Sequence, residues 1–475
     1  MNPLLYFLAY FKTNYFTACF APFFILLFLT RYVKFRFLSH RVLLVGIIML
    51  GLILRLFWLG FSSYSAKIDW DSKHMLESDV TNVQAIKLTK GIWFHDGSGN
   101  PTGRRPIGYP VLLGTLYKVF GVHHRIAYGL NLLLFVWSVY LVFLLGRMLY
   151  SERAGLWSVF FYSIYPISVY SINMMTDEHL FVPLFFLGLY FLLKEVHGCP
   201  VKWPLLWYGL IFGYATMVRT HSIFTPMTVA LAYCLLKYPW KKTVMAFLTV
   251  MLLMQIVNLP WAIRNYKAWG TPVIYTATAN FVYRTVNSSA TPEGGGHIPL
   301  KGEEGYSEEL ERAGLLNNEG LYHKLCNREM MRWITGHPYA FLKLGLCRVI
   351  FFMGWNRAGG VWPIWFQYYE GSYDPARPIA PNVKHFLEEA AFLFYYVLFF
   401  MFLSSVFFIW RRWKRLSRQC QISLLVLGSV FVFWLLEHMV IYPDRKYRYP
   451  LEPLMIVWVS VWLDWIAFGS KKDVP

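Results

Sequence analysis

The chain has 475 residues, of which 57% are hydrophobic, 19% aromatic and only 15% charged. Soluble domains carry about 25% charged residues, so this composition excludes an ordinary soluble protein. The net charge of +19 does not indicate nucleic-acid binding, because many of the basic residues lie in short loops beside apolar runs, where they orient a membrane protein and meet anionic lipid. We therefore expect membrane lipid, and no nucleic acid, among its partners.

Apolar runs of roughly 17–25 residues recur along the chain, which is the length that crosses about 30 Å of hydrocarbon. They predict an all-α polytopic membrane protein with about eleven spans. Residues 1–41 are expected to form a leading span and a basic cytoplasmic link, in which Arg31, Lys34, Arg36 and Arg41 follow an apolar run. Basic residues favour the cytoplasmic side of a membrane, so the next span leads outward.

A polar loop, 62–110, follows the apolar run 42–61 and is expected on the outer side. Its segment LESDVTNVQAIKLTKG predicts an amphipathic helix that begins at Ser78 or Asp79. Asp79 suits a helix N-cap, and a carboxylate there could equally accept a proton from an attacking hydroxyl. The residues alone leave both interpretations open. The apolar, aromatic stretch 106–120 predicts an interfacial helix on the outer leaflet.

The rest of the chain divides into three further regions. The transmembrane core is expected over 42–261, with the loop 62–110 as its outer part. Residues 262–382 are largely polar and predict an extracytoplasmic insert with an in-plane or re-entrant helix near 339–355. Residues 383–475 predict the C-terminal spans, with a basic outer loop at 442–449.

Charged residues near the predicted outer ends of the spans point to a site. Glu178, beside Asp177, begins a span, and a carboxylate that enters a membrane helix is costly and often functional. Several basic residues lie on the side that the charge rule disfavours, which suggests a phosphate or another anionic partner. The candidate phosphate-binding residues are Arg104, Arg105, Arg219, Arg445, Lys446 and Arg448. Weaker candidates for substrate binding are Asp177, His221, Arg264, Tyr266, Tyr109 and Tyr447.

A cofactor is not evident from the sequence. Asp79, Glu178 and His179 could share a divalent metal cation if they converge. Because a single histidine is more often a packing residue, the metal stays an open expectation.

Five motifs in order resemble the GT-C glycosyltransferase superfamily, in particular the branch with protein O-mannosyltransferases and bacterial lipid A aminoarabinose transferases. The first outer loop reads S-D-x5-A-x2-L-x2-G, and R-R-P-I-G-Y-P follows it. The later motifs are MTDEHLF at 175–181, PWAIRNY at 260–266 and RKYRYP at 445–450. The resemblance runs from about residue 55 to 465. It implies a GT-C-like helix bundle with extracytoplasmic interfacial helices.

The resemblance also implies a glycosyltransferase that uses a polyprenyl-phosphate or dolichyl-phosphate sugar donor on the extracytoplasmic face of the plasma (inner) membrane. The essential base of the family maps onto Asp79, the later acid onto Glu178, and the basic residue before proline onto Arg105. Where relatives have a second acid after the first, this chain has Val80. The acceptor is a glycan, a lipid or a protein.

Elementary chemistry agrees with this assignment. A polyprenyl-phosphate leaving group needs its charge neutralised, which fixed arginines and lysines do well. Asp79 would deprotonate the acceptor hydroxyl as it attacks the anomeric carbon with inversion. The alternatives are a polyprenyl-linked glycan ligase or polymerase, which would carry decisive basic residues in a large late loop, and a non-catalytic lipid transporter, which would have broken helices in two related halves.

Overall fold

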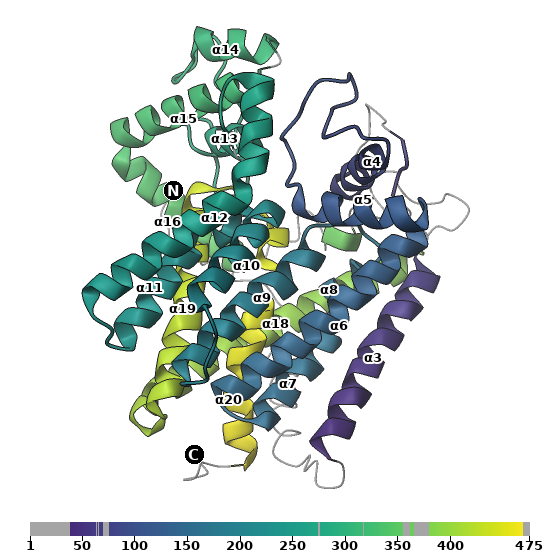
Figure 1. The fold of residues 1–475 in the computed structure, drawn as a ribbon, viewed down its shortest axis with the longest axis vertical. Helices are drawn as coiled ribbons and strands as arrows, with labels where there is room; N and C mark the ends of the chain where they lie inside the picture. The colour runs from purple at the N-terminus through teal and green to yellow at the C-terminus, as the bar shows by residue number, and fades with distance from the viewer. Residues whose placement is uncertain are drawn as a thin grey trace.

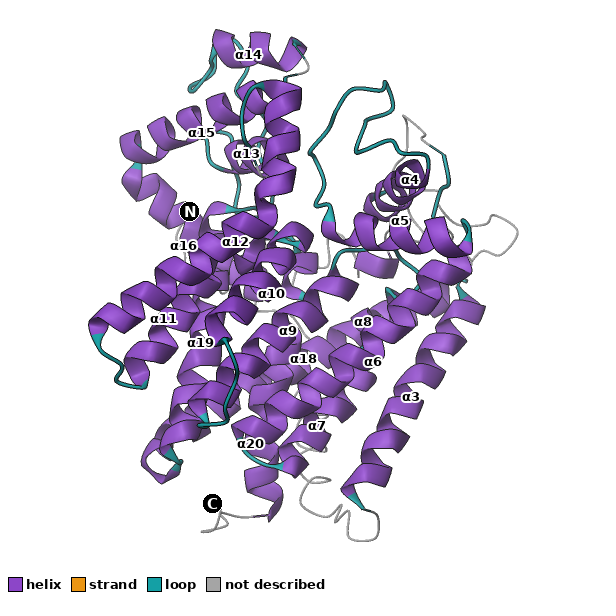
Figure 2. Cartoon of the chain, viewed as in Figure 1, coloured by secondary structure: helices purple, strands orange, loops and turns teal. Residues whose placement is uncertain are grey.

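The computed structural model describes residues 39–62, 64, 66–69, 76–273, 276–316, 318–354, 362–364 and 380–468. All but the end of the predicted leading segment 1–41 therefore lies outside the described residues. The described chain forms helices joined by loops (Figure 2), and His95 and Pro101 form an isolated β-bridge. This confirms the predicted all-α class.

Six helices of the described chain are long and apolar enough to cross a membrane. They are α3 (His40–Phe61), α6 (His124–Leu149), α9 (Glu178–Val196), α12 (Trp240–Trp269), α18 (Pro381–Arg411) and α19 (Arg418–Val440). Shorter helices complete the bundle: α7 (Glu152–Ser163), α8 (Pro166–Tyr170), α10 (Pro204–Val218), η1 (Thr220–Phe224), α11 (Thr225–Leu235) and α20 (Glu452–Phe468). The protein is an integral membrane protein. The total of about eleven spans stays a prediction.

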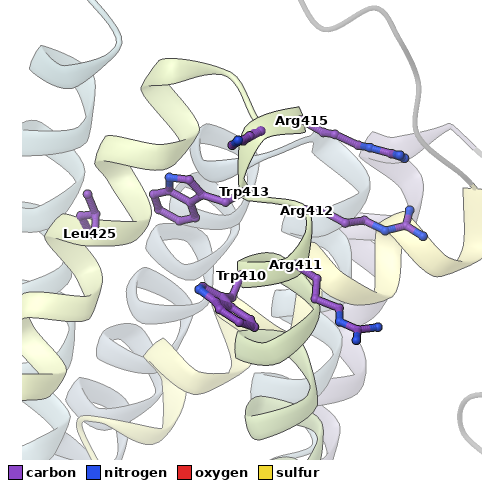
Figure 3. A pocket seen from close by; sticks show the side chains of 7 residues that line it. Trp410, Arg411, Arg412, Trp413, Arg415 and Leu425 are labelled. Atoms are coloured by element: carbon purple, nitrogen blue, oxygen red, sulfur yellow. The ribbon is translucent and has the colours of Figure 1, made fainter.

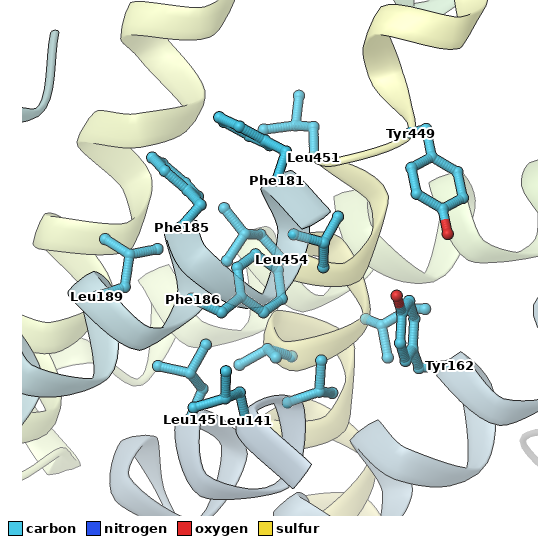
Figure 4. Close-up of a cluster of buried hydrophobic side chains, with 14 of the residues drawn as sticks. Leu141, Leu145, Tyr162, Phe181, Phe185, Phe186, Leu189, Tyr449, Leu451 and Leu454 are labelled. Carbon is cyan, nitrogen blue, oxygen red and sulfur yellow. The ribbon is translucent and has the colours of Figure 1, made fainter. Parts of the chain in front are cut away.

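The centre of the bundle is a cluster of buried apolar side chains from α6, α9 and α20 (Figure 4). Phe181, Phe185 and Phe186 of α9 lie beside Leu454 of α20, and all four are buried. Because lipid tails are as apolar as leucine, tight packing stabilises such a bundle. A Cβ added to Gly188 would lie 2.4 Å from the ring of Phe212, so glycine there lets α9 approach α10.

Two helical assemblies cover the same end of the bundle (Figure 1). The first contains α4 (Glu77–Thr89) and α5 (Gly108–Phe120), joined by the loop 90–107. The second contains α13 (Thr276–Thr285), α14 (Glu308–Leu315) and α15 (Glu319–Gly336). These helices occupy the predicted loop 62–110 and the predicted insert.

The segment predicted to lie in the membrane plane forms α16 (Pro338–Met353). This helix packs against the end of α19, where a Cβ added to Gly345 would meet the side chain of Met439 at 2.9 Å. The buried guanidinium of Arg348 donates to the carbonyl oxygens of Val440 and Thr285, which joins α16 to α19 and α13. The start of the insert is therefore fixed to the bundle by hydrogen bonds.

Candidate functional site

Asp79 lies in the first turn of α4 and is fully buried. The helix begins at Glu77, with Leu76 as N-cap, so the predicted start at Ser78 or Asp79 was one to two residues late. The Asp79 carboxylate turns back and accepts hydrogen bonds from the backbone N–H of Leu76 at 3.0 Å and of Lys67 at 2.9 Å. It also accepts one from the hydroxyl of Tyr64 at 3.2 Å. Asp79 is thus the third residue of α4 and not its N-cap, and its three donors all precede the helix.

These contacts act on the pKa of Asp79 in opposite directions. Burial raises the pKa of its carboxyl above the ordinary value, and the hydrogen bonds from Lys67, Leu76 and Tyr64 partly offset that rise. Removing a carboxylate from water disfavours its charged form, whereas donors aimed at it favour that form. The net result is a carboxylate more basic than a solvated aspartate.

Glu77 is a functional candidate that the sequence analysis missed. Its Oε2 lies 3.4 Å from a guanidinium nitrogen of Arg105 and also pairs with Nζ of Lys446. Each residue of an α-helix turns about 100°, so Glu77 and Asp79 point to nearly opposite sides of the start of α4. Glu77, the first acid of the E-S-D string, is therefore the one that contacts Arg105 and Lys446.

A buried ion pair joins the start of α9 to the end of α10. Oε1 of Glu178 lies 2.6 Å from a guanidinium nitrogen of Arg219, and both side chains are almost completely buried. The Arg219 guanidinium lies 5.1 Å from the ring centre of Tyr447. Tyr447 belongs to η3 (Arg445–Arg448), the same short helix that carries Lys446. Glu178 and Arg219, both predicted site residues, therefore lie close to Lys446, which contacts Glu77.

Asp177 completes this group. Burial and the neighbouring charge of Glu178 raise the pKa of Asp177 to about 7, against the opposing effect of Arg219 and Arg105. Oδ1 of Asp177 and Oε2 of Glu178 are buried and accept no hydrogen bond from the part of the chain that the structure describes. A bound ligand with hydroxyl groups could supply those donors.

We call this group the carboxylate–cation cluster. It consists of Glu77, Arg105, Asp177, Glu178, Arg219, Lys446 and Tyr447. Its members come from the starts of α4 and α9, the end of α10, the loop before α5, and η3. The hydroxyl of Ser78 accepts a hydrogen bond from the backbone N–H of Met175 at 2.8 Å, which ties α4 to the loop that carries Asp177.

Other predicted phosphate ligands have different partners. Arg104 is largely exposed and lies 3.2 Å from Glu319 of α15. Arg448 pairs with Glu452 at 2.6 Å and donates to the carbonyl oxygen of Phe352 at 2.7 Å. The side chain of Arg445 lies outside the described residues. Of the predicted phosphate ligands with a described side chain, Arg105, Arg219 and Lys446 are the ones in the cluster.

The weaker substrate-binding candidates also have structural contacts. The Arg264 guanidinium donates to the carbonyl oxygen of Phe94 at 2.7 Å, and Tyr266 is 57% exposed. The buried hydroxyl of Tyr109 donates to Asn131 at 2.6 Å. His221 lies 2.8 Å from Glu437 and stacks on Trp434 with ring centres 4.4 Å apart. Of these four residues, His221 also contacts the cluster residue Tyr447, edge to face, with ring centres 5.8 Å apart.

The suggested metal set does not converge. The described residues contain no group of three or more His, Cys, Asp and Glu side chains that could hold a metal ion. Nε2 of His179 lies 2.9 Å from the carbonyl oxygen of Ser171 instead. Asp79 and Glu178 are likewise bound to separate partners, as described above, so in the described structure Asp79, Glu178 and His179 do not form a joint group.

Glu319 joins the two helical assemblies that cover the end of the bundle. Its carboxylate accepts hydrogen bonds from the hydroxyl of Thr102 and the backbone N–H of Gly103, both at 2.8 Å, and pairs with Arg104. The loop before α5 is therefore held against α15, at the start of the insert's third helix.

We expect Glu319→Ala to loosen the loop 92–103 without unfolding the bundle. Two hydrogen bonds to a carboxylate are lost, each worth about 1.5–3 kcal/mol, so amide exchange in the loop should rise by at least about tenfold. Hydrogen–deuterium exchange of the purified protein measures this. Glu308→Ala is the control, because its exposed pair with Arg312 contributes only about 0.3–0.5 kcal/mol. An equal change in both variants would contradict the assigned role of Glu319.

Comparison with known proteins gives a partial family match and a fold. Residues 104–263 match the family described as dolichyl-phosphate-mannose-protein mannosyltransferase. An oligosaccharyltransferase from Archaeoglobus fulgidus, tethered with an acceptor peptide, is 13% identical with a TM-score of 0.50 over 90% of this chain. The chain has the GT-C fold. The predicted GT-C-like fold is thereby confirmed.

Other solved structures are similar to this GT-C protein. ArnT from Cupriavidus metallidurans bound to undecaprenyl phosphate is 13% identical with a TM-score of 0.42, covering 83% of this chain and 76% of its own. AglB from Archaeoglobus fulgidus in complex with an inhibitory peptide and a dolichol-phosphate is 13% identical with a TM-score of 0.49 over 89% of this chain. The GT-C protein spans about half the length of the Archaeoglobus enzyme, 50% and 49% in the two structures. No curated protein matches it.

Proposed function

We propose that this GT-C protein is a glycosyltransferase that moves a sugar from a polyprenyl-phosphate donor to an acceptor hydroxyl on the extracytoplasmic side of the plasma membrane. The observation that carries the proposal is the carboxylate–cation cluster at the end of an apolar bundle. The matched family, which takes a dolichyl-phosphate sugar by its name, supports the donor class. The acceptor is a glycan, a lipid or a protein.

The cations of the cluster are suited to a phosphate. Arg105 and Lys446 both contact one oxygen of Glu77, which accepts from two cationic donors as a phosphate oxygen would. We infer that a donor phosphate takes over these two contacts and that Glu77 holds them in place until then. Fixed cations stabilise the charge that develops on a leaving phosphate without reorganising at the moment of reaction.

Asp79 is the proposed general base. Its raised pKa makes it a better proton acceptor near neutral pH than a solvated aspartate. The longest of its three hydrogen bonds, at 3.2 Å, comes from Tyr64, and we infer that an acceptor hydroxyl replaces this one. The proton then passes to Asp79 as the hydroxyl oxygen attacks the anomeric carbon, and the bond to the phosphate oxygen breaks.

The test of the phosphate assignment compares two adjacent arginines. Arg105→Gln should raise the donor Kd by about 10–100-fold, because a hydrogen bond to a charged group is worth about 1.5–3 kcal/mol. Arg104→Gln should leave it unchanged, since Arg104 is largely exposed and pairs with Glu319. Binding of a radiolabelled polyprenyl-phosphate sugar to the purified protein in nanodiscs measures both.

The same preparation tests the activity itself. Labelled sugar should pass to acceptors in an envelope extract, or to water, only in the presence of the protein. If the labelled donor binds to the protein but its sugar is never transferred, the result would favour the transporter alternative. An equal loss of affinity in both arginine variants would remove the cluster from phosphate binding.

Asp177 offers a prediction about pH. With its pKa at about 7, Asp177 is half protonated near neutrality and fully ionised only above that. If its unpartnered Oδ1 accepts a hydrogen bond from the bound sugar or acceptor, kcat/KM rises with pH through about 7 and then levels off. Asp177→Asn should remove this limb and lower the plateau by about tenfold. Initial rates between pH 5.5 and 9 measure it, and an unchanged profile would exclude this role.

A further inference from the structure

The turn between α18 and α19 lines a hollow at the surface of the bundle. It has the sequence WRRWKR over 410–415, and its last three residues form η2 (Trp413–Arg415). Together with Leu425 of α19 these residues surround a hollow of about 970 Å³ (Figure 3). The hollow is thus lined by four basic residues, two tryptophans and a leucine. Figure 3 shows the labelled arginines on one side of the turn and the tryptophans on the other.

The basic side chains of this turn are available to an anion. Within the described residues, no carboxylate pairs with Arg411, Arg412, Lys414 or Arg415. Their described contacts are with aromatic rings: Arg411 lies 5.0 Å from the ring centre of Phe407, and Arg412 lies 4.7 Å from that of Phe408. Stacking covers the face of a guanidinium and leaves its N–H edge free to bind oxygen. Arg105, Arg219 and Arg448, by contrast, each pair with a carboxylate.

Helix α20 fixes the position of the hollow relative to the carboxylate–cation cluster. Its first residue, Glu452, pairs with Arg448 of η3. Near its other end, the ring of Trp465 lies 5.2 Å from the guanidinium of Arg412. Since α20 has 17 residues and a helix rises 1.5 Å per residue, about 25 Å separates its two ends. That is close to the ~30 Å thickness of the hydrocarbon layer, so the hollow lies at the opposite membrane surface.

The apolar side of the hollow faces the membrane region. Trp410 is 70% exposed and Leu425 is 41% exposed, although both lie at the ends of membrane-spanning helices. Tryptophan is enriched at the level of lipid headgroups. A soluble anion would use the basic residues alone, whereas a lipid would use both the basic residues and this apolar wall.

We propose that the hollow binds the headgroup of an anionic phospholipid in the leaflet opposite the carboxylate–cation cluster. The phosphodiester accepts hydrogen bonds from the basic residues of the turn, and an acyl chain lies along Trp410 and Leu425. The site is independent of the proposed sugar transfer, and it would anchor the turn between α18 and α19 to the membrane surface.

A photoactivatable phosphatidylglycerol tests the proposal with the full-length protein in nanodiscs. We expect labelling of the peptide 410–425 over a phosphatidylcholine analogue. The double variant Arg411→Gln, Arg415→Gln should lower that labelling by about 25-fold, since each basic residue near an anionic surface contributes about a fivefold factor. Arg411→Lys, Arg415→Lys keeps the charge and should retain most of the labelling, which separates loss of charge from misfolding.

The control removes two exposed lysines at the same end of the bundle. Lys202 precedes α10 and Lys241 lies in the first turn of α12; Lys202→Gln, Lys241→Gln should label as the wild type does. Equal labelling by the two lipids, or an equal loss in this control, would show only general attraction to the charged surface and would overturn the proposal. Competition by soluble glycerophosphate at the concentration of the lipid would identify a free phosphate site instead.

Discussion

Replacing Asp79 by asparagine is expected to lower sugar transfer by about 10²–10⁴-fold, the usual contribution of a general base. The asparagine side chain keeps one acceptor oxygen but places an NH₂ group where the carboxylate accepted from a backbone N–H, so a loss of stability is also expected. Donor affinity should change little, because the described contacts of Asp79 are with Tyr64, Lys67 and Leu76 and not with the cluster cations. Single-turnover rates and donor binding, measured on the same preparation, separate these effects.

Asp96 provides the matched control for this variant. Its carboxylate also accepts two backbone hydrogen bonds, from Ser98 and Asn100 at 2.9 Å, in the same outer region of the chain. Asp96→Asn therefore measures the cost of an asparagine in a turn without any proposed chemistry. Turnover of Asp79→Asn within about threefold of the Asp96→Asn value would remove Asp79 from the mechanism.

Tyr64→Phe refines the same test. It removes the one side-chain donor to Asp79 and leaves the two backbone donors, so the carboxylate stays in place. If the acceptor hydroxyl replaces the Tyr64 hydroxyl in the complex, this variant retains most of its turnover. A loss as large as that of Asp79→Asn would mean that Tyr64 itself participates in the reaction.

The sequence predicted the helix bundle well because the apolar runs that indicate its helices are long. Runs of about 20 apolar residues leave few alternatives to a spanning helix, and α3, α6, α9, α12, α18 and α19 each contain one of the apolar runs and extend beyond it. The apolar stretch 156–171 is typical of a single span, but it forms parts of two shorter helices, α7 and α8. They are separated at Pro166, which lacks the N–H that would continue the helix and stands at the start of α8.

The candidate site was only partly predictable, and the arginines explain why. The charge rule identifies positive residues on the disfavoured side of a membrane, but it does not distinguish a phosphate from a backbone carbonyl as the partner. Arg264 donates to carbonyl oxygens of the loop before α5, and Arg448 donates to those at the end of α16. Helix and loop ends leave such carbonyls without partners, and only the three-dimensional arrangement shows which arginine meets them.

Glu77 was missed for a related reason. The family resemblance pointed to Asp79, and the two-residue spacing, about 200° around the helix, places the two acids on different sides. The carboxylate that pairs with Arg105 and Lys446 is separated from Lys446 by several hundred residues. No periodicity within α4 contains that information.

The second large effect is expected for the ion pair between Arg219 and Glu178. Both side chains are buried and 2.6 Å apart, so Arg219→Gln leaves a buried carboxylate without its partner. Breaking such a pair costs about 3–5 kcal/mol, and Glu178→Gln should cost a similar amount. The double variant Arg219→Gln, Glu178→Gln carries no uncompensated charge and should regain most of this stability. Thermal unfolding in nanodiscs compares the three variants.

Donor binding then separates a structural role of the pair from a functional one. If Arg219 also meets the donor phosphate, the double variant is stable and still binds the donor at least about tenfold more weakly than the wild type. If the pair only joins α9 to α10, donor affinity returns together with stability, and the phosphate is held by Arg105 and Lys446 alone. Because the double variant removes one positive and one negative charge, the net charge of the cluster is the same in both proteins. A difference in affinity would therefore report direct contacts of Arg219 or Glu178 with the donor rather than a change in the overall field.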